Sequence, residues 1–374
     1  MIKFYRDTWA CIDMDALAHN YQQFTHLRPN QEMIAVIKGN AYGHGDVQVA
    51  KLFAELDATY LAVSSLDEAI RLRKHDIKTP IIVVAPIKMS DVNIAAEFNI
   101  TAIAYDEQWV DELAKINLNR QLKLHLEVET GMNRIGLRDV ALAYEKLSQI
   151  DHVAIEGIYT HIASADSDLC SVDRQLDAFR RITKSFKPDT FKYVHVANTA
   201  TTLQLELEGI NAHRVGLGLY GINPDDDFIK TDLYLRLAFS LYSCLTQVSK
   251  VKKGDAVSYG GTFVAEEDMY VGTMSVGYAD GWCRSNQGRA VVINGHECEI
   301  IGRVCMDQMM VKLPSADFCI GDVATLIGDC LPVNRVANEL GTIAYEVLTL
   351  INGRIPRVYK KNGEIIDCNL GRFR

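Results

Sequence analysis

Lys38 is the first residue whose type and position suit chemistry rather than packing. It closes the apolar run "AVIK" and precedes "GNAYGHG". A charged group at the end of an apolar segment is costly to bury without compensation. Two interpretations stand at this point. The side chain reaches solvent from a strand end, or the amine is kept for its chemistry while the glycines let a ligand approach the backbone.

Polar residues follow other apolar runs in the same way. Arg134 comes after the fifth predicted strand, His161 closes the sixth and Asn198 closes the seventh, while Arg214 and Gly216 lie on the eighth. Each of them alone could be a satisfied polar group or a solvated loop residue. Gathered on one face, a lysine, two arginines and a histidine suit an anionic ligand with a carbonyl that the lysine amine can capture.

The elements that must position these residues alternate along the first two thirds of the chain. Amphipathic segments such as 46–57, 66–76 and 170–186, often opened by aspartate or serine, separate short runs rich in β-branched residues. The predicted strands are 33–38, 60–65, 80–85, 100–105, 122–129, 154–161, 193–198 and 213–221. Eight such units predict a closed, TIM-like (β/α)8 barrel with its site at the carboxyl ends of the strands. No GxGxxG loop follows the first strand, which argues against an open dinucleotide-binding sheet.

The pattern changes after about residue 235, where strands alternate with turns. Lys253-Gly254-Asp255 is a predicted turn, Asn294-Gly295 is a strong hairpin signal, and a late helix is expected over 333–341. The predicted domains are therefore a barrel over 11–234 and a mostly β domain over 235–374, with residues 1–10 as a candidate addition to the second.

The composition narrows the class of protein. With a net charge of −9 over 374 residues, nucleic acid is not expected as the main partner. The nine cysteines are odd in number and form no CxxC pair, which favours reduced thiols in the cytoplasm over disulfides or a metal site. No apolar run reaches membrane-spanning length, and the N-terminus lacks a signal-peptide core. If the protein is membrane-associated, its anchor lies outside this sequence.

Eight motifs in order, from about Trp9 to Tyr359, resemble the alanine racemase family. They are "AVIKGNAYGHG", "ETGMNRIGL", "GIYTHIASAD", "HVANTA", "RVGLGLYG", "VSYGGTF", "SVGYADGW" and "GRVCMDQMMV". The resemblance implies that Lys38 carries pyridoxal 5′-phosphate (PLP) as a Schiff base and is one of two acid–base groups on opposite faces of the substrate carbon. The other is Tyr259, which in this family reaches the partner subunit of a head-to-tail homodimer. The implied product is a D-amino acid for cell-wall precursors.

The resemblance also implies a supporting set of residues. His161 and Arg214 resemble the pair that links the tyrosine to the pyridine nitrogen, where an arginine keeps the ring unprotonated. Arg134 and the backbone of Met306 match the substrate carboxylate site. Tyr278 and Asp307 match the active-site entrance, with a structural role as an equal alternative. The implied cofactor-binding residues are Lys38, Tyr42, His161, Asn198, Thr199, Arg214, Gly216 and Leu217.

Two departures from the family pattern bear on specificity. Glu127 stands where many members have a carbamylated lysine, and its anion is expected to orient Arg134; an ordinary strand carboxylate is the alternative. Asn352-Gly353 replaces the usual Ser-Tyr, which removes a phenol beside the substrate side chain and offers an amide to a hydroxyl.

The second departure resembles the serine racemase domains of vancomycin-resistance membrane proteins. We therefore expect racemisation of serine as well as alanine, with a housekeeping alanine racemase as the alternative. The chain could also be the cytoplasmic domain of such a membrane-anchored protein. A non-catalytic PLP-binding barrel is disfavoured by the second domain and Tyr259, and a decarboxylase of the same barrel class by the missing triple-glycine and EPGR-like motifs.

Overall fold

A computed structural model describes residues 5–370 of the chain. The chain divides into two compact units, each with its own sheet. The barrel unit runs from Ala18 to Ala41 and from Asp46 to Leu235. The sheet unit joins residues 5–17, the segment Tyr42–Gly45 and residues 236–370. The predicted boundary between residues 234 and 235 lies next to this division.

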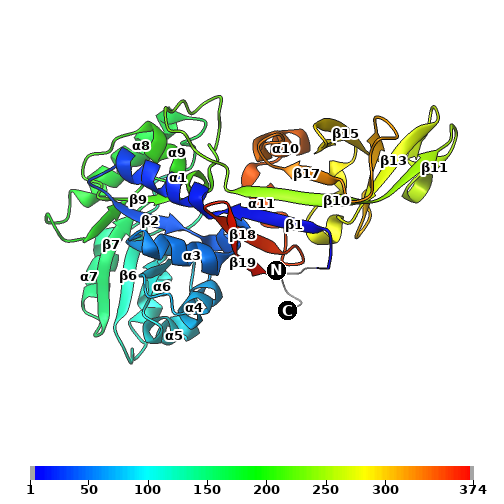
Figure 1. Ribbon diagram of the computed structural model, residues 1–374. Coiled ribbons are helices and arrows are strands. Elements are labelled where there is room, and N and C mark those ends of the chain that lie inside the picture. Colours follow the sequence, from blue (N-terminus) through cyan, green and yellow to red (C-terminus); the bar gives the residue numbers. More distant parts are fainter. Residues whose placement is uncertain (1–4, 371–374) are drawn as a thin grey trace. The chain divides into compact units, whose positions relative to one another are not determined.

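The barrel unit is a closed ring of eight parallel strands, which confirms the predicted TIM-like barrel (Figure 1). The strands are β2 (Glu32–Val36), β3 (Tyr60–Val63), β4 (Ile81–Val83), β5 (Ile100–Ala104), β6 (Leu122–Glu127), β7 (Val153–Tyr159), β8 (Tyr193–His195) and β9 (Ala212–Val215). Each pairs in parallel with the next, and β2 pairs with β9 to close the ring. The ring places every strand's carboxyl end on one face, where the predicted site residues belong.

Helices precede, connect and follow the strands of this ring. They are α1 (Met14–Leu27), α2 (Lys38–Tyr42), α3 (Asp46–Glu55), α4 (Leu66–Lys74), α5 (Val92–Glu97), α6 (Glu107–Leu113), α7 (Val140–Ser148), α8 (Leu169–Thr183) and α9 (Thr199–Gln204), with the 3-10 turns η1 (Met89–Asp91) and η2 (Leu217–Tyr220). Several begin as their sequences predict: Ser65, Asp106 and Asp168 each accept a hydrogen bond from a backbone N–H in the first turn.

The centre of the ring holds a buried apolar cluster with polar groups beside it. The cluster consists of Ile34, Tyr60, Ala62, Ile82, Ile103, Tyr159, Tyr193 and Ala212. His125, His195 and Arg214 are buried in the same barrel. Polar groups this deep are costly unless hydrogen bonds satisfy them, so their partners bear directly on the site.

The sheet unit contains a nine-stranded sheet of order β13-β16-β15-β14-β17-β10-β1-β18-β19. Its strands are β1 (Thr8–Asp13), β10 (Phe239–Val251), β13 (Met269–Met274), β14 (Ala290–Ile293), β15 (His296–Ile301), β16 (Met309–Leu313), β17 (Val323–Ile327), β18 (Arg357–Lys361) and β19 (Glu364–Asn369), with a small ribbon of β11 (Ala256–Val257) and β12 (Phe263–Val264). Because β13 also pairs with β10, six of these strands close into an antiparallel ring. β1 pairs with both β10 and β18, so the N-terminal strand belongs to this unit.

Turns and helices of the sheet unit follow the sequence in part. Asn294 and Gly295 both have positive φ and join β14 to β15 as a two-residue hairpin, as predicted. The turn at Lys253–Asp255 is also present. The predicted late helix is α10 (Val333–Leu340), and a second helix, α11 (Ala344–Leu350), follows without having been predicted. The remaining turns of this unit are η3 (Tyr259–Gly261), η4 (Tyr278–Asp280) and η5 (Arg284–Asn286).

Several strand ends differ from the prediction, and the differences fall at the site. β2 stops at Val36, so Lys38 does not end a strand but begins α2. β8 stops at His195, and Asn198 instead caps α9. β9 stops at Val215, and η2 takes up the rest of the predicted eighth strand. Apolar character continues past each strand end because the site loops are themselves buried.

Candidate active site

Lys38 is followed by a left-handed turn. Gly39, Asn40, Ala41 and Tyr42 have φ between 51° and 64°, a conformation that costs L-residues roughly 1–2 kcal/mol each. Hydrogen bonds hold the strained backbone: the Gly39 N–H donates to Glu68 Oε1 at 2.7 Å and the Ala41 N–H to the Ile37 carbonyl at 2.8 Å. Strain of this kind concentrates at functional sites, where surrounding structure fixes one geometry.

The Lys38 amine lies in a positive environment. Burial lowers its pKa, and the charges of Arg134 and Arg214 lower it further, while Glu68 acts in the opposite direction. A lowered pKa increases the share of free amine, which is the form that attacks a carbonyl. The same couplings show that the barrel brings Lys38, Arg134 and Arg214 together, as the sequence predicted from three separate strands.

Arg214, on β9, is 5% exposed and is held by neutral acceptors. Nη1 donates to His195 Nδ1 at 2.8 Å and to the His195 carbonyl at 3.1 Å. Nη2 donates to the Thr160 carbonyl at 3.0 Å and to His161 Nδ1 at 3.2 Å. Within residues 5–370, the Nε–H group of Arg214 has no hydrogen-bond partner and remains available to a ligand.

His161 is a neutral imidazole in this arrangement. Burial lowers its pKa to about 3, and the charges of Arg214, Arg134 and Lys38 act in the same direction. Because an arginine only donates, His161 Nδ1 must accept the hydrogen bond from Arg214, and the ring proton sits on Nε2. The histidine therefore presents an N–H group on the side away from Arg214.

Glu127 does not form the ion pair expected with Arg134. Its carboxylate, at the end of β6 and buried, accepts a 2.6 Å hydrogen bond from the Tyr159 hydroxyl. Burial raises the pKa of Glu127, and the charges of Arg214 and Arg134 only partly offset this. Its influence on Arg134 is thus a through-space one, and the orienting role stays a prediction.

A cluster of backbone N–H groups and one hydroxyl follows β8 and β9. Thr199 Oγ1 accepts hydrogen bonds from the N–H groups of Gly216 (3.1 Å) and Gly218 (3.3 Å), which leaves the hydroxyl hydrogen to donate elsewhere. Leu217 is the first residue of η2, so its N–H has no partner inside that turn. A Cβ at Gly218 would lie 2.4 Å from the Phe24 ring, so only glycine allows this packing.

Asn198 has a structural contact in this cluster. Its Oδ1 accepts hydrogen bonds from the N–H (2.9 Å) and hydroxyl (3.1 Å) of Thr201 and thereby caps α9. This places Asn198 beside the cluster as a helix cap. Direct contact of its side chain with a cofactor stays a prediction.

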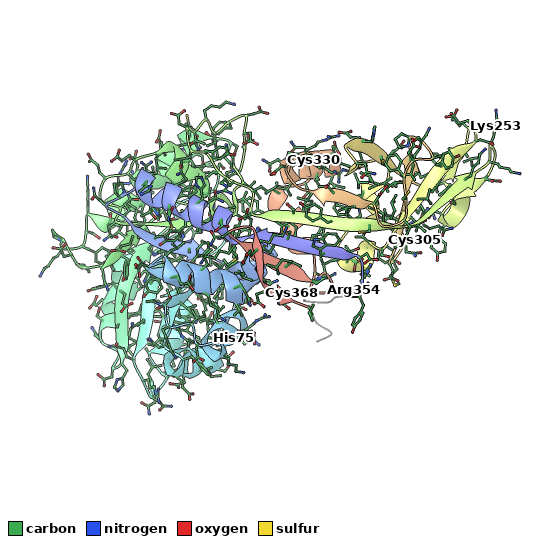
Figure 2. All side chains as sticks on the ribbon, viewed as in Figure 1. His75, Lys253, Cys305, Cys330, Arg354 and Cys368 are labelled. Atoms are coloured by element: carbon green, nitrogen blue, oxygen red, sulfur yellow. The ribbon has the colours of Figure 1, made fainter. Side chains whose placement is uncertain are left out.

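The other predicted residues lie in the sheet unit, where three loops are braced together. The Tyr278 N–H donates to the Cys305 carbonyl and the Ala279 N–H to the Met306 carbonyl, both at 3.0 Å. Asn352 Nδ2 donates to the Ala279 carbonyl at 2.7 Å. Three predicted substrate-site residues, Tyr278, Met306 and Asn352, are therefore held in adjacent loops. Cys305 and Arg354, which belong to these loops, are labelled in Figure 2.

Both polar atoms of the Asn352 side-chain amide are engaged in this bracing. Besides the bond to Ala279, its Oδ1 accepts from the Arg354 N–H at 2.9 Å, and Arg354 in turn donates to Asp307 Oδ1 at 2.7 Å. Asp307 thus anchors a loop, in line with the structural alternative. The expectation that Asn352 offers its amide to a substrate hydroxyl finds no support in this geometry.

Tyr259 and Tyr42 differ sharply in exposure. The Tyr259 side chain is 71% exposed, on a turn attached by a 2.6 Å hydrogen bond from Ser258 Oγ to the Arg303 carbonyl. Tyr42 is buried, its ring 5.8 Å from that of Tyr345, and burial raises the pKa of its phenol well above the usual value. An exposed phenol on an anchored turn is suited to act on a group outside its own unit.

Sequence reasoning missed His195, which bonds Arg214, Tyr159, which bonds Glu127, and His125, which bonds His195. The available signal was a histidine inside an otherwise apolar strand, in "LKLHLEVE" and "YVHVAN".

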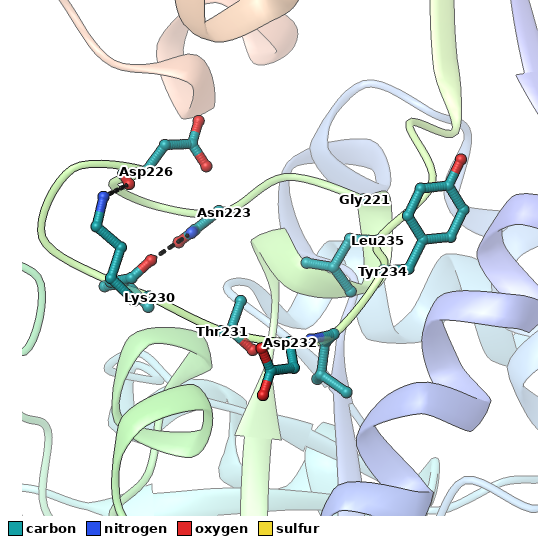
Figure 3. A pocket seen from close by; sticks show the side chains of 10 residues that line it. Gly221, Asn223, Asp226, Lys230, Thr231, Asp232, Tyr234 and Leu235 are labelled. Atoms are coloured by element: carbon teal, nitrogen blue, oxygen red, sulfur yellow. Dashed lines mark hydrogen bonds between the residues drawn. The ribbon is translucent and has the colours of Figure 1, made fainter.

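A separate pocket of about 620 Å³ is lined by Gly221 and residues of the 223–235 loop (Figure 3), among them Lys230, whose amine donates to the Asp226 carbonyl at 2.7 Å. None of the predicted site residues lines it.

The fold and these side chains define a class: a barrel enzyme with a lysine of lowered pKa after its first barrel strand, followed by a β domain. Comparison with known proteins gives the family. The alanine racemase N-terminal domain matches residues 12–224 and the alanine racemase C-terminal domain residues 238–359. The chain belongs to the alanine racemase family and is a PLP-dependent isomerase.

Named relatives and solved structures agree with this family assignment. The chain is 39% identical to alanine racemase 1 of Bacillus subtilis, covering 97% of this chain and 96% of that protein, and 41% identical to an alanine racemase of Lactococcus lactis, covering 95% and 99%. The alanine racemase of Bacillus anthracis with bound L-Ala-P matches with a TM-score of 0.92 at 37% identity, over 98% of both chains. The expected resemblance to serine racemase domains is not supported, because these relatives are named as alanine racemases.

The barrel residues fit PLP. The Lys38 amine suits its aldehyde, the Thr199 hydroxyl and neighbouring N–H groups suit its phosphate, and Arg214 Nε–H suits its ring nitrogen. No cluster of three or more metal-ligating side chains occurs within residues 5–370. No helix in that range is both long and apolar enough to cross a membrane.

Proposed function

We propose that this protein is an alanine racemase that interconverts L- and D-alanine with PLP and supplies D-alanine for cell-wall precursors. The observation that carries the proposal is the Arg214 guanidinium, whose Nη groups are all engaged by neutral acceptors while Nε–H stays available. This N–H group is a donor that suits an unprotonated pyridine nitrogen. The two family domains and the alanine racemases among its relatives supply the reaction class.

Different residues of the chain are assigned to proton transfer, substrate binding and phosphate binding. Bound PLP supplies an electron-accepting ring that stabilises negative charge at the substrate carbon. Lys38 moves a proton at that carbon from one face, and Tyr259 of the partner subunit moves it from the other. Arg134 binds the substrate carboxylate, and Thr199 with Gly216 and Leu217 holds the phosphate. The homodimer that this division requires is part of the proposal.

Serine is the second candidate substrate. The observation in its favour is Gly353, which leaves no ring where the family usually has a phenol. The bracing role of Asn352 argues against a dedicated hydroxyl-binding site. We therefore rank alanine first and expect serine to be accepted more weakly, since a pocket rejects one added hydroxyl by only about 10²-fold.

The test is a comparison of kcat/KM for L-alanine, D-alanine and L-serine on the purified holoenzyme. We expect racemisation of alanine in both directions and slower turnover of serine. Gly353→Tyr restores the phenol and keeps the Asn352 bracing, and it should lower kcat/KM for serine far more than for alanine. Turnover of serine without alanine would overturn the ranking, and turnover of neither would overturn the proposal.

A further inference from the structure

A chain of three hydrogen-bonded side chains crosses the interior of the barrel. Arg214 Nη1 donates to His195 Nδ1 at 2.8 Å, and His195 Nε2 lies 2.8 Å from His125 Nδ1. The three residues come from β9, β8 and β6 and are 5%, 0% and 0% exposed. Neither histidine was predicted as a site residue.

The proton positions along this chain follow from elementary chemistry. Arginine has only donors, so His195 Nδ1 accepts and the His195 proton sits on Nε2. That proton is donated to His125 Nδ1, so the His125 proton sits on its own Nε2. Within residues 5–370 this last N–H group has no hydrogen-bond partner, although it is buried. Both rings are Nε2–H tautomers, and the direction of donation is the same throughout.

Neither histidine gains a second proton near neutral pH. Burial lowers the pKa of His125 to about 3, with the charge of Arg214 acting in the same direction. Burial, Arg214 and His125 together hold the pKa of His195 well below its usual value. Two neutral rings therefore lie behind one guanidinium, and none of the hydrogen bonds of Arg214 goes to a carboxylate.

The rings are clamped by their surroundings. Tyr159 stacks on His195 with centroids 4.7 Å apart and planes at 8°, and Tyr193 stacks on His125 at 5.7 Å. A Cβ at Gly157 would lie 2.7 Å from His125 Nδ1, so any side chain there would displace the ring. The positions that bear on Arg214 are thus set by packing as well as by hydrogen bonds.

We propose that His195 and His125 are positioning residues, which hold Arg214 so that its Nε–H is presented to the ring nitrogen of PLP. The inference rests on the proposed function for the identity of that acceptor. By engaging Nη1 through a neutral acceptor whose own proton is fixed, the pair leaves the guanidinium fully charged and unable to rotate. A charged, fixed arginine at the ring nitrogen discourages its protonation and, with it, transamination as a side reaction.

The first experiment reads the tautomers without the cofactor. Nitrogen-15 NMR of histidine-labelled apoprotein between pH 5.5 and 8 should show two rings that are protonated on Nε2 only and do not titrate. His125→Leu and His195→Leu assign the two signals. Protonation of either ring on Nδ1, or titration near pH 6.5, overturns the proposal whatever reaction the enzyme catalyses.

The second experiment separates positioning from mere stability. His125→Asn can place its Oδ1 where Nδ1 was and keep an acceptor for His195, whereas His125→Leu removes the acceptor. We expect His125→Leu to bind PLP about tenfold more weakly or worse, as for an unsatisfied buried donor, and to raise the ratio of transamination to racemisation. His125→Asn should restore both toward wild type.

The matched control is His213, a buried histidine on the same strand as Arg214 whose Nδ1 lies 3.3 Å from Gln31 Oε1. His213→Leu should alter neither the PLP affinity nor the transamination ratio. If His125→Leu and His213→Leu behave alike, or if His125→Leu lowers only the melting temperature, His125 is structural and the proposal fails. Failure of Lys38→Ala to abolish racemisation would instead count against the proposed function and leave the NMR result standing.

Discussion

The barrel unit and the sheet unit hold their candidate site residues in opposite ways. In the barrel, Arg214, Glu127 and Thr199 are buried and hydrogen-bonded to named partners. Lys38 is half-buried beside them, and Arg134 is exposed. In the sheet unit, Tyr259, Tyr278 and Met306 are exposed, and hydrogen bonds fix the backbone of their loops rather than their side chains. Buried residues of the first kind suit permanent binding of a cofactor. Exposed residues of the second kind suit contact with a substrate that comes and goes.

Substitution of Lys38 in the barrel unit should have the largest effect on activity. Lys38→Ala removes the group expected to hold PLP covalently and to move one proton, so racemisation should fall by roughly 10³-fold or more. Borohydride reduction should no longer fix a pyridoxyl group to the protein. Lys78→Ala, at an exposed lysine paired only with Asp76, is the control and should change neither readout. A reducible adduct that persists without Lys38 would show that another amine holds the cofactor.

Substitution of Tyr259 tests whether an exposed residue of the sheet unit takes part in proton transfer. Tyr259→Phe should lower racemisation by roughly 10²-fold as expected for loss of a general acid–base group, while PLP stays bound because no barrel contact changes. Exchange of the α-proton with deuterated solvent should survive for one enantiomer only. Tyr234→Phe, at a tyrosine 73% exposed, is the control. Undiminished turnover in both directions would exclude Tyr259 as a base.

Acid should destabilise the barrel unit through its buried histidines. The pKa of His213 is lowered to about 4 by burial and by Arg28, against about 6.5 in the unfolded chain. Since the unfolded chain binds more protons between those values, stability falls as pH drops from 7 to 5, by about 2 kcal/mol for one such group. His213→Gln should flatten this dependence.

Tryptophan fluorescence can assign the acid effect to one unit. Trp109 is the only tryptophan of the barrel unit, whereas Trp9 and Trp282 belong to the sheet unit. A variant that keeps Trp109 alone should report the pH-dependent change in melting temperature. An identical pH dependence in His213→Gln would contradict the assignment.

Thr199 gives the smallest expected effect. Thr199→Val keeps the shape but removes the oxygen that accepts from Gly216 and Gly218 and the hydroxyl proposed to meet the phosphate. We expect PLP to bind about tenfold more weakly, as for one lost hydrogen-bonding group, with kcat at saturating cofactor close to wild type. Thr199→Ser should restore binding. A change in kcat without a change in PLP affinity would move Thr199 out of the cofactor site.

Much of the fold was predictable because local chemistry repeats it. Eight β-branched runs separated by capped amphipathic segments leave few alternatives to a barrel, and Asn294-Gly295 leaves few to a two-residue hairpin. That the candidate site residues Lys38, Arg134, His161 and Arg214 gather at one face was predictable for the same reason, since the carboxyl ends of parallel strands must meet. The pairing of β1 with β10 and β18 joins residues far apart in sequence, and no local pattern indicates it.

By itself, then, the sequence determined which residues could do chemistry and on which face of the barrel they had to gather. Only the tertiary structure decided how each is held. The left-handed turn after Lys38, the bond from Tyr159 that engages Glu127, the loop bracing by Asn352 and the histidines behind Arg214 all depend on partners from other parts of the chain. Hydrogen bonds and burial act at a few ångströms, and sequence spacing does not specify which distant group completes them.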